Sequence, residues 1–183
     1  MFVSSRLTAL LQVVPVLLLS VLLPAAAGGQ AYLVEDINTT DLQSDPLGIR
    51  DGVTLGATLL FGIGTDEDSA QLWSSNGTPA GTQLVRNVAP GSQFGLLNGM
   101  TRVGALAFFS ADDAGFGSEL WRSDGTPGGT FRLSDVNPGP ADSNAQELCA
   151  VGSTLFFIAS NPTLGQELWK SDGTVAGTVL VKD

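Results

Sequence analysis

A long internal repeat constrains this chain more than any other feature. The three tryptophans, Trp73, Trp121 and Trp169, stand at equal intervals. The same step separates glycines and phenylalanines: Gly56, Gly104 and Gly152, and Phe61, Phe109 and Phe157. A fixed period of about 48 residues is typical of stacked supersecondary units, as in propellers and solenoids.

Each tryptophan lies in a copy of one motif: AQLWSSNGTPAGT, SELWRSDGTPGGT or QELWKSDGTVAGT. Asp-Gly after a strand indicates a turn, because glycine tolerates positive φ and aspartate accepts hydrogen bonds from the following backbone. The alternative is a calcium loop, but the first copy has Asn76 in place of the acid and so lacks charge that calcium favours. We therefore interpret the following motif residues as structural: Leu72, Trp73, Asn76, Gly77, Glu119, Leu120, Trp121, Asp124, Gly125, Thr126, Glu167, Leu168, Trp169, Asp172, Gly173 and Thr174.

The segments between turns predict four short strands in each repeat. In the third repeat these are 148–152, 154–160, 167–171 and 178–183, rich in β-branched and aromatic residues. Neighbours such as Leu120 and Trp121 must point to opposite faces of a strand, so both faces of the sheet should be covered. The predicted fold is all-β: a propeller-like array of about three four-stranded blades.

The repeat predicts an incomplete ring. Segments of the LV-x-D type occur four times, at 33–36, 84–87, 132–135 and 180–183, whereas the other strand types occur three times. We predict repeats at about 32–82, 83–130 and 131–178, followed by the start of a fourth. An open end would expose an apolar face and an unpaired edge, and so favour self-association.

The motif resembles the ELWxxDGT repeat family of secreted bacterial proteins. Three copies cover nearly all of the chain after Ala31, although the first departs from the pattern at Gln71, Ser75 and Asn76. The resemblance implies an extracellular, propeller-like repeat domain. It implies no defined biochemical activity.

The segment 1–31 predicts a secretory signal peptide. Arg6 precedes an apolar stretch, and small residues then offer cleavage after Ala27 or Ala31. An uncleaved membrane anchor is the alternative, but Gln12 and Pro15 interrupt a run that would need about 20 apolar residues. We expect residues 32–183 to form the secreted or cell-surface domain, without membrane insertion after cleavage.

The charge and the cysteine content of the chain limit the partners that it is expected to have. The net charge of −10 makes nucleic acid an unfavourable ligand, because the protein would repel phosphates. Cys149 is the only cysteine, so it has no intrachain disulfide partner, and its position in the repeat predicts a small buried strand residue.

Acidic residues are the remaining candidates for chemistry. Asp66 and Asp68, and Asp112 and Asp113, fall at matching positions between the second and third predicted strands. We expect solvated acidic loops there, with a weak calcium site as the alternative and no other cofactor. The chain has no histidine, and nothing predicts two carboxyls with well-separated pKa values, so we expect no catalysis by these acids.

These observations favour a non-enzymatic, secreted or surface-bound repeat module that binds protein or glycan, or serves adhesion. Two alternatives stay open. One is a structural repeat of an envelope or matrix, stiffened by calcium; the other is the N-terminal part of a larger secreted enzyme.

Overall fold

The computed structural model describes residues 49–65, 69–88, 90, 97–113 and 115–182, which lie in one of the chain's two compact units, Leu33–Asp183. The described residues form twelve strands and one short 3₁₀ helix, η1 (Pro79–Gly81). This confirms the all-β prediction.

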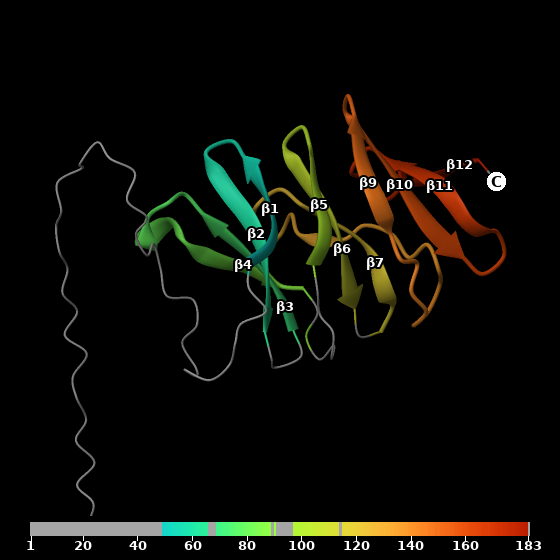
Figure 1. Cartoon of the computed structure of the whole chain (residues 1–183), viewed down its shortest axis with the longest axis horizontal. Helices are drawn as coiled ribbons and strands as arrows, with labels where there is room; N and C mark the ends of the chain where they lie inside the picture. Colours follow the sequence, from blue (N-terminus) through green and yellow to red (C-terminus); the bar gives the residue numbers. More distant parts are fainter. Residues whose placement is uncertain (1–48, 66–68, 89, 91–96, 114, 183) are drawn as a thin grey trace, which may run out of the picture. The chain divides into compact units, whose positions relative to one another are not determined.

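The strands form three four-stranded antiparallel sheets, in which each strand pairs with its neighbours along the chain (Figure 1). The first sheet contains β1 (Ile49–Leu55), β2 (Thr58–Thr65), β3 (Ser69–Ser75) and β4 (Gln83–Asn87). The second contains β5 (Leu97–Val103), β6 (Leu106–Asp113), β7 (Gly117–Ser123) and β8 (Phe131–Arg132). The third contains β9 (Gln146–Val151), β10 (Thr154–Asn161), β11 (Gly165–Ser171) and β12 (Val179–Lys182).

A tight hairpin opens every sheet and explains the repeated glycines. Leu55 pairs with Thr58 across a two-residue loop, and the equivalent loops follow Val103 and Val151. The first residue of each loop is Gly56, Gly104 or Gly152, with φ between 60° and 63°. Two-residue hairpin turns need positive φ at this position, which glycine adopts without steric cost.

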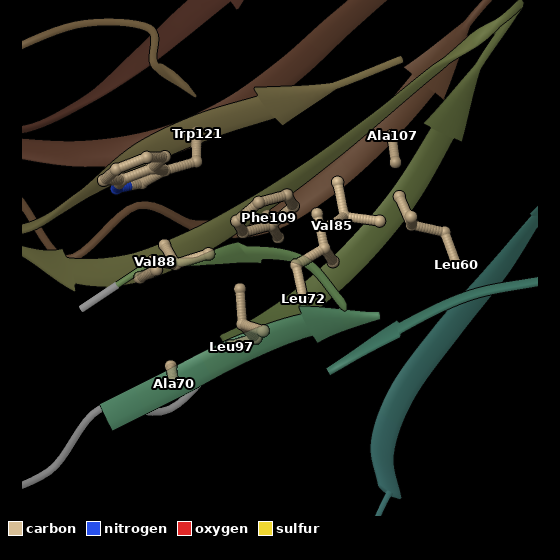
Figure 2. Packing of buried hydrophobic residues seen from close by; sticks show 10 residues of the cluster. Leu60, Ala70, Leu72, Val85, Val88, Leu97, Ala107, Phe109 and Trp121 are labelled. Atoms are coloured by element: carbon tan, nitrogen blue, oxygen red, sulfur yellow. The ribbon is translucent and has the colours of Figure 1, made fainter. Parts of the chain in front are cut away.

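Apolar side chains join the first sheet to the second. The cluster contains Leu60, Ala70, Leu72, Val85 and Val88 from the first sheet and its following segment, and Leu97, Ala107, Phe109, Ala111 and Trp121 from the second (Figure 2). All of these residues are buried. At about 1.5–3 kcal/mol for each large aliphatic or aromatic side chain, this burial is a principal source of stability.

A second cluster joins the second sheet to the third by equivalent residues. Its members include Phe108, Leu120 and Leu133 on one side, and Leu155, Phe157 and Ala159 on the other. Each lies one repeat length after a member of the first cluster: Leu60, Leu72, Val85, Ala107, Phe109 and Ala111. The chain therefore uses one type of interface twice.

The middle sheet shows why leucine and tryptophan are adjacent in the motif. Trp121 packs in the first cluster and Leu120 in the second, so the two side chains are buried against different neighbouring sheets. The prediction that both faces are covered is thus confirmed for this sheet. Trp73 and Trp169, in the outer sheets, are half-buried.

The first strands of the sheets also lie next to one another. The amide of Gly99 in β5 donates a hydrogen bond of 2.8 Å to Asp51 Oδ2 in β1. Thr101 Oγ1 in β5 donates to the carbonyl oxygen of Leu148 in β9, at 3.3 Å. These contacts link three strands that are separated by whole repeats.

The structure corrects several details of the sequence prediction. Cys149 lies on a strand, but it is exposed rather than buried, since β9 has no further sheet beside it among the described residues. Asp112 and Asp113 belong to the end of β6 and not to a loop. The fourth strand of the third repeat, predicted at 178–183, corresponds to β12 (Val179–Lys182). The predicted signal peptide, the segment 33–36, Asp66 and Asp68 lie outside the described residues.

Gly173 offers a test of the close approach between sheets. Its φ is +89°, and a Cβ added there would lie 2.5 Å from Leu106 Cδ1 of the second sheet. Gly77, its equivalent in the first sheet, has a φ of +84° and no such neighbour within 4 Å. We expect Gly77→Ala to lower the free energy of unfolding by about 1–2 kcal/mol through backbone strain alone. Gly173→Ala should cost about 1 kcal/mol more, because the end of the Leu106 side chain must move aside.

Urea denaturation of the two variants measures this difference. Equal losses of stability would contradict the proposed role of Gly173 in sheet contact.

Candidate functional site

The SDGT segments form hydrogen-bonded turns after the third strand of each sheet. In the middle copy, Asp124 Oδ1 accepts hydrogen bonds from the amide and the hydroxyl of Thr126, at 2.9 and 2.7 Å. Thr126 Oγ1 accepts from the amide of Gly129 at 3.0 Å, and Ser123 and Thr130 share a hydroxyl hydrogen bond of 2.7 Å. A local network of this kind restrains the conformation of the loop.

The other two copies repeat these contacts. Asp172 Oδ1 accepts from the amide and hydroxyl of Thr174, and Asn76 Oδ1 does the same with Thr78. Hydrogen bonds from the threonine lower the pKa of both carboxyls, Asp124 and Asp172. Since asparagine serves equally well in the first copy, the turn needs the side-chain oxygen and not a charge.

The second glycine of the motif is required by the same turn. A Cβ on Gly129 would collide with the carboxylate of Asp124, and a Cβ on Gly177 with that of Asp172. The motif D-G-T-x-x-G therefore requires glycine at its last position, because the aspartate carboxylate occupies the place that a Cβ would take.

Glu119 of the motif does not take part in the turn, and it has a structural role that the sequence did not indicate. It is fully buried, and its two carboxyl oxygens accept hydrogen bonds of 3.1 Å from the amides of Val136 and Ser143. Both amides belong to the segment that connects β8 to β9. Glu119 therefore fastens the connection between the second and third sheets onto strand β7.

Burial also changes the acidity of this group. Removal from water raises the pKa of Glu119 from 4.5 to about 7, and the hydrogen bonds from Ser143 and Val136 limit the rise. The carboxyl has no solvent-accessible surface and both its oxygens are engaged, so it is a structural acid rather than a group that faces a substrate.

The opposite end of the second and third sheets carries turns whose sequences differ between these two repeats. We define the variable end as the described residues 112, 113, 115–117, 137–142 and 161–165, which come from the β6–β7 turn, part of the β8–β9 connection and the β10–β11 turn and the strand ends beside them. The register of β6 on β7 pairs Asp113 with Gly117 here and Ala107 with Ser123 next to the SDGT turn. The two kinds of turn thus lie at opposite ends of the same strands.

Hydrogen bonds hold the variable end together. The amide of Ser118 donates to Asp142 Oδ1 at 2.8 Å, and Asn161 Nδ2 donates to the carbonyl oxygen of Val136 at 2.8 Å. Within the β10–β11 turn, Asn161 Oδ1 accepts from the amide and hydroxyl of Thr163. The turns are therefore fixed relative to the connection between the sheets.

Two exposed apolar residues stand at the variable end, and the sequence analysis did not single them out. Phe116 and Leu164 occupy equivalent positions in the β6–β7 and β10–β11 turns, and both are exposed. The guanidinium carbon of Arg132 lies 3.3 Å from the centroid of the Phe116 ring, which holds the ring in place. The sequence did contain a sign of this exposure, because Phe116 lies between Gly115 and Gly117, and Leu164 precedes Gly165, in segments typical of turns.

The candidate calcium ligands are only partly within the described residues. Asp112 and Asp113 are half-buried and adjacent at the end of β6, and the carbonyl of Asp113 accepts the amide of Phe116. In the described part of the chain, acidic residues, cysteine and histidine form no group of three or more that could hold a metal ion.

Comparisons with protein-family models, with curated proteins and with solved structures each found no match for this chain. Among the described residues, the structure contains no helix with the length and apolar character needed to cross a membrane.

The Glu119 contact predicts a position-specific effect on stability. Glu119→Ala leaves the buried amide of Val136 without an acceptor, whereas the amide of Ser143 keeps its hydrogen bond to the carbonyl oxygen of Ser118, so the free energy of unfolding should fall by about 1–3 kcal/mol. Glu167→Ala, at the same motif position in the third sheet, should change it by less than about 0.5 kcal/mol because that side chain is only half-buried. Denaturant titration distinguishes the two; similar losses would show that Glu119 does not act through the connecting segment.

The raised pKa of Glu119 also predicts a pH dependence. Because the folded state holds this proton more tightly than the unfolded state, the contribution to stability is complete below about pH 4.5 and is lost as the pH rises through about 7. Glu119→Gln removes the titrating group. The difference in unfolding free energy between wild type and Glu119→Gln, measured across this range, should therefore shift in favour of the variant as the pH rises. A constant difference would contradict the assignment.

Proposed function

We propose that the chain is a secreted or cell-surface, propeller-like repeat module that binds a protein or glycan through its variable end. The observation that carries the proposal is the separation of constant and variable turns at opposite ends of one rigid set of strands. Binding residues commonly lie on loops that a rigid scaffold positions.

The proposed propeller-like arrangement is supported by the repeated interface. Equivalent apolar residues join successive sheets, and the first strands β1, β5 and β9 lie next to one another. Successive four-stranded sheets related in this way are typical of propeller blades. The described residues contain three such sheets, fewer than a closed ring commonly has.

The variable end has the chemistry of a recognition surface. The Phe116 ring is 38% exposed although Arg132 lies over it, and Asp112 and Asp113 provide carboxylate groups at the end of the neighbouring strand β6. Aromatic rings contribute apolar contact area at low entropic cost, and carboxylates accept hydrogen bonds from hydroxyl or amide donors. A glycan or a polar protein surface suits this combination.

A non-catalytic role is supported by the placement of the most perturbed carboxyl. Glu119 is buried and holds the β8–β9 connection, so it does not face a substrate. The 183-residue sequence also contains no histidine to serve as a general base.

Screening the purified protein on glycan and extracellular-protein arrays tests the proposal. We expect Phe116→Ser to weaken binding to any ligand found by at least about tenfold, as for an aromatic residue central to an interface. The matched control is Val175→Ser, which changes an exposed apolar residue in the SDGT-type turn at the other end. Equal loss in both variants, or binding that survives Phe116→Ser unchanged, would exclude the variable end as the binding surface.

A further inference from the structure

Two asparagines of the chain are followed by glycine: Asn76 by Gly77, and Asn98 by Gly99. An asparagine in this context can lose its side-chain amide by an internal reaction, because glycine has no side chain to keep its backbone nitrogen away from the asparagine Cγ. The first dipeptide lies in the exposed turn after β3, and the second lies within β5. These different surroundings determine which of the two can react.

The turn prepares the side-chain carbonyl of Asn76 for attack. Its Oδ1 accepts hydrogen bonds from the amide and the hydroxyl of Thr78, at 3.1 and 2.7 Å. Donors in these positions make Cγ more electrophilic and stabilise the negative charge that develops on Oδ1 when a nucleophile adds. Asn76, Gly77 and Thr78 are all exposed, so water can accept the proton that the attacking nitrogen loses.

The amide of Gly77, which is the nucleophile once it is deprotonated, donates to a neutral acceptor. Its hydrogen bond to the hydroxyl oxygen of Ser75 measures 3.1 Å. A neutral acceptor opposes loss of the amide proton less than a carboxylate does, because it holds the proton less strongly. The space beside the Gly77 Cα is open, since no heavy atom lies within 4 Å of the place that a Cβ would take.

The second dipeptide is protected from the same reaction. The amide of Gly99 donates a hydrogen bond of 2.8 Å to the carboxylate oxygen Oδ2 of Asp51. A negative charge at this distance disfavours deprotonation of the amide. Asn98 also pairs with Ser110 of β6, so its backbone cannot turn toward its own side chain without breaking the strand pairing.

We propose that Asn76 is a site of spontaneous deamidation, which converts the first SDGT-type turn to the aspartate form that the other two turns already have. The deprotonated nitrogen of Gly77 forms a bond to Asn76 Cγ, and the bond from Cγ to Nδ2 breaks. Nδ2 accepts a proton from water and leaves as ammonia. Water then opens the succinimide ring: cleavage between the ring nitrogen and Cγ gives aspartate, and cleavage between the nitrogen and the main-chain carbonyl carbon gives isoaspartate.

The two products differ in their effect on the turn. Asp124 and Asp172 make the same hydrogen bonds to their threonines as Asn76 makes to Thr78. Aspartate at position 76 should therefore keep the turn and add a negative charge. Isoaspartate lengthens the backbone by a methylene group and shortens the side chain by the same amount, so its carboxylate cannot make the hydrogen bonds to Thr78 in this geometry. Deamidation thus produces one native-like and one altered form of the turn.

Peptide mass spectrometry after incubation of the purified chain at neutral pH tests the proposal, with digestion at acidic pH to prevent further reaction. We expect a gain of about 1 Da at Asn76. The rate should be at least about tenfold higher than at Asn98, as for a modest difference in activation free energy. Equal rates at the two asparagines, faster reaction at Asn98, or no gain at Asn76 over several weeks would overturn the proposal.

Asp51→Asn tests the reason for the difference between the two sites. The variant keeps an acceptor oxygen for the amide of Gly99 but removes the charge that opposes deprotonation. The rate at Asn98 should rise at least about threefold, and the rate at Asn76, in a different part of the sheet, should stay as in wild type. No acceleration at Asn98 would contradict the protective role of Asp51, and equal acceleration at both sites would show a general loosening of the fold instead.

Asn76→Asp produces the aspartate form directly. Because the equivalent aspartates keep the turn in the other two copies, this variant should unfold at the same urea concentration as wild type. A chain that has been deamidated during incubation should contain, in addition, a fraction that unfolds at lower urea concentration, which is the isoaspartate form. A variant that itself unfolds at lower concentration would contradict the equivalence of the three turns.

Discussion

Burial of both faces of the middle sheet is the constraint on which the rest of the structure depends. Trp121 and Phe109 pack toward the first sheet, and Leu120 and Phe108 pack toward the third. A four-stranded sheet that is apolar on both sides cannot be stable alone in water, so the repeat is a unit of assembly rather than a domain. The close approach of Leu106 to Gly173, and the hydrogen bond of 2.9 Å from Arg122 Nη1 to the carbonyl oxygen of Gly173, lie between the second and third sheets.

The sequence predicted those features that depend on local chemistry. The period of the tryptophans and the β-branched runs predicted the strands. In the third repeat, no end of a strand differs from its predicted position by more than two residues. Adjacent leucine and tryptophan predicted that both faces are covered, because a strand must direct neighbouring side chains to opposite sides. The turn could also be predicted from the sequence, because Asp124 and Thr126, which form a hydrogen bond with each other, are only two positions apart.

Features that depend on a distant segment could not be predicted in this way. The partners of Glu119 lie 17 and 24 residues further along the chain, and the motif contains no sign of them. Cys149 was expected to be buried because of its position in the repeat, but its exposure depends on whether another sheet lies beside β9. Phe116 and Leu164 have ordinary identities for a strand or a turn, and they became notable only when the turns were placed on one end of the sheets.

The pairing of every strand with its neighbour along the chain has a consequence for how such proteins change over generations. No strand of one sheet completes another sheet among those described, so a stretch of one repeat length is self-contained in its backbone pairing. Duplication or deletion of one such stretch in the gene would lengthen or shorten the array and recreate a junction of the existing type. Growth by whole units therefore needs no newly evolved junction, and each added unit brings one more turn that is open to selection for a new ligand.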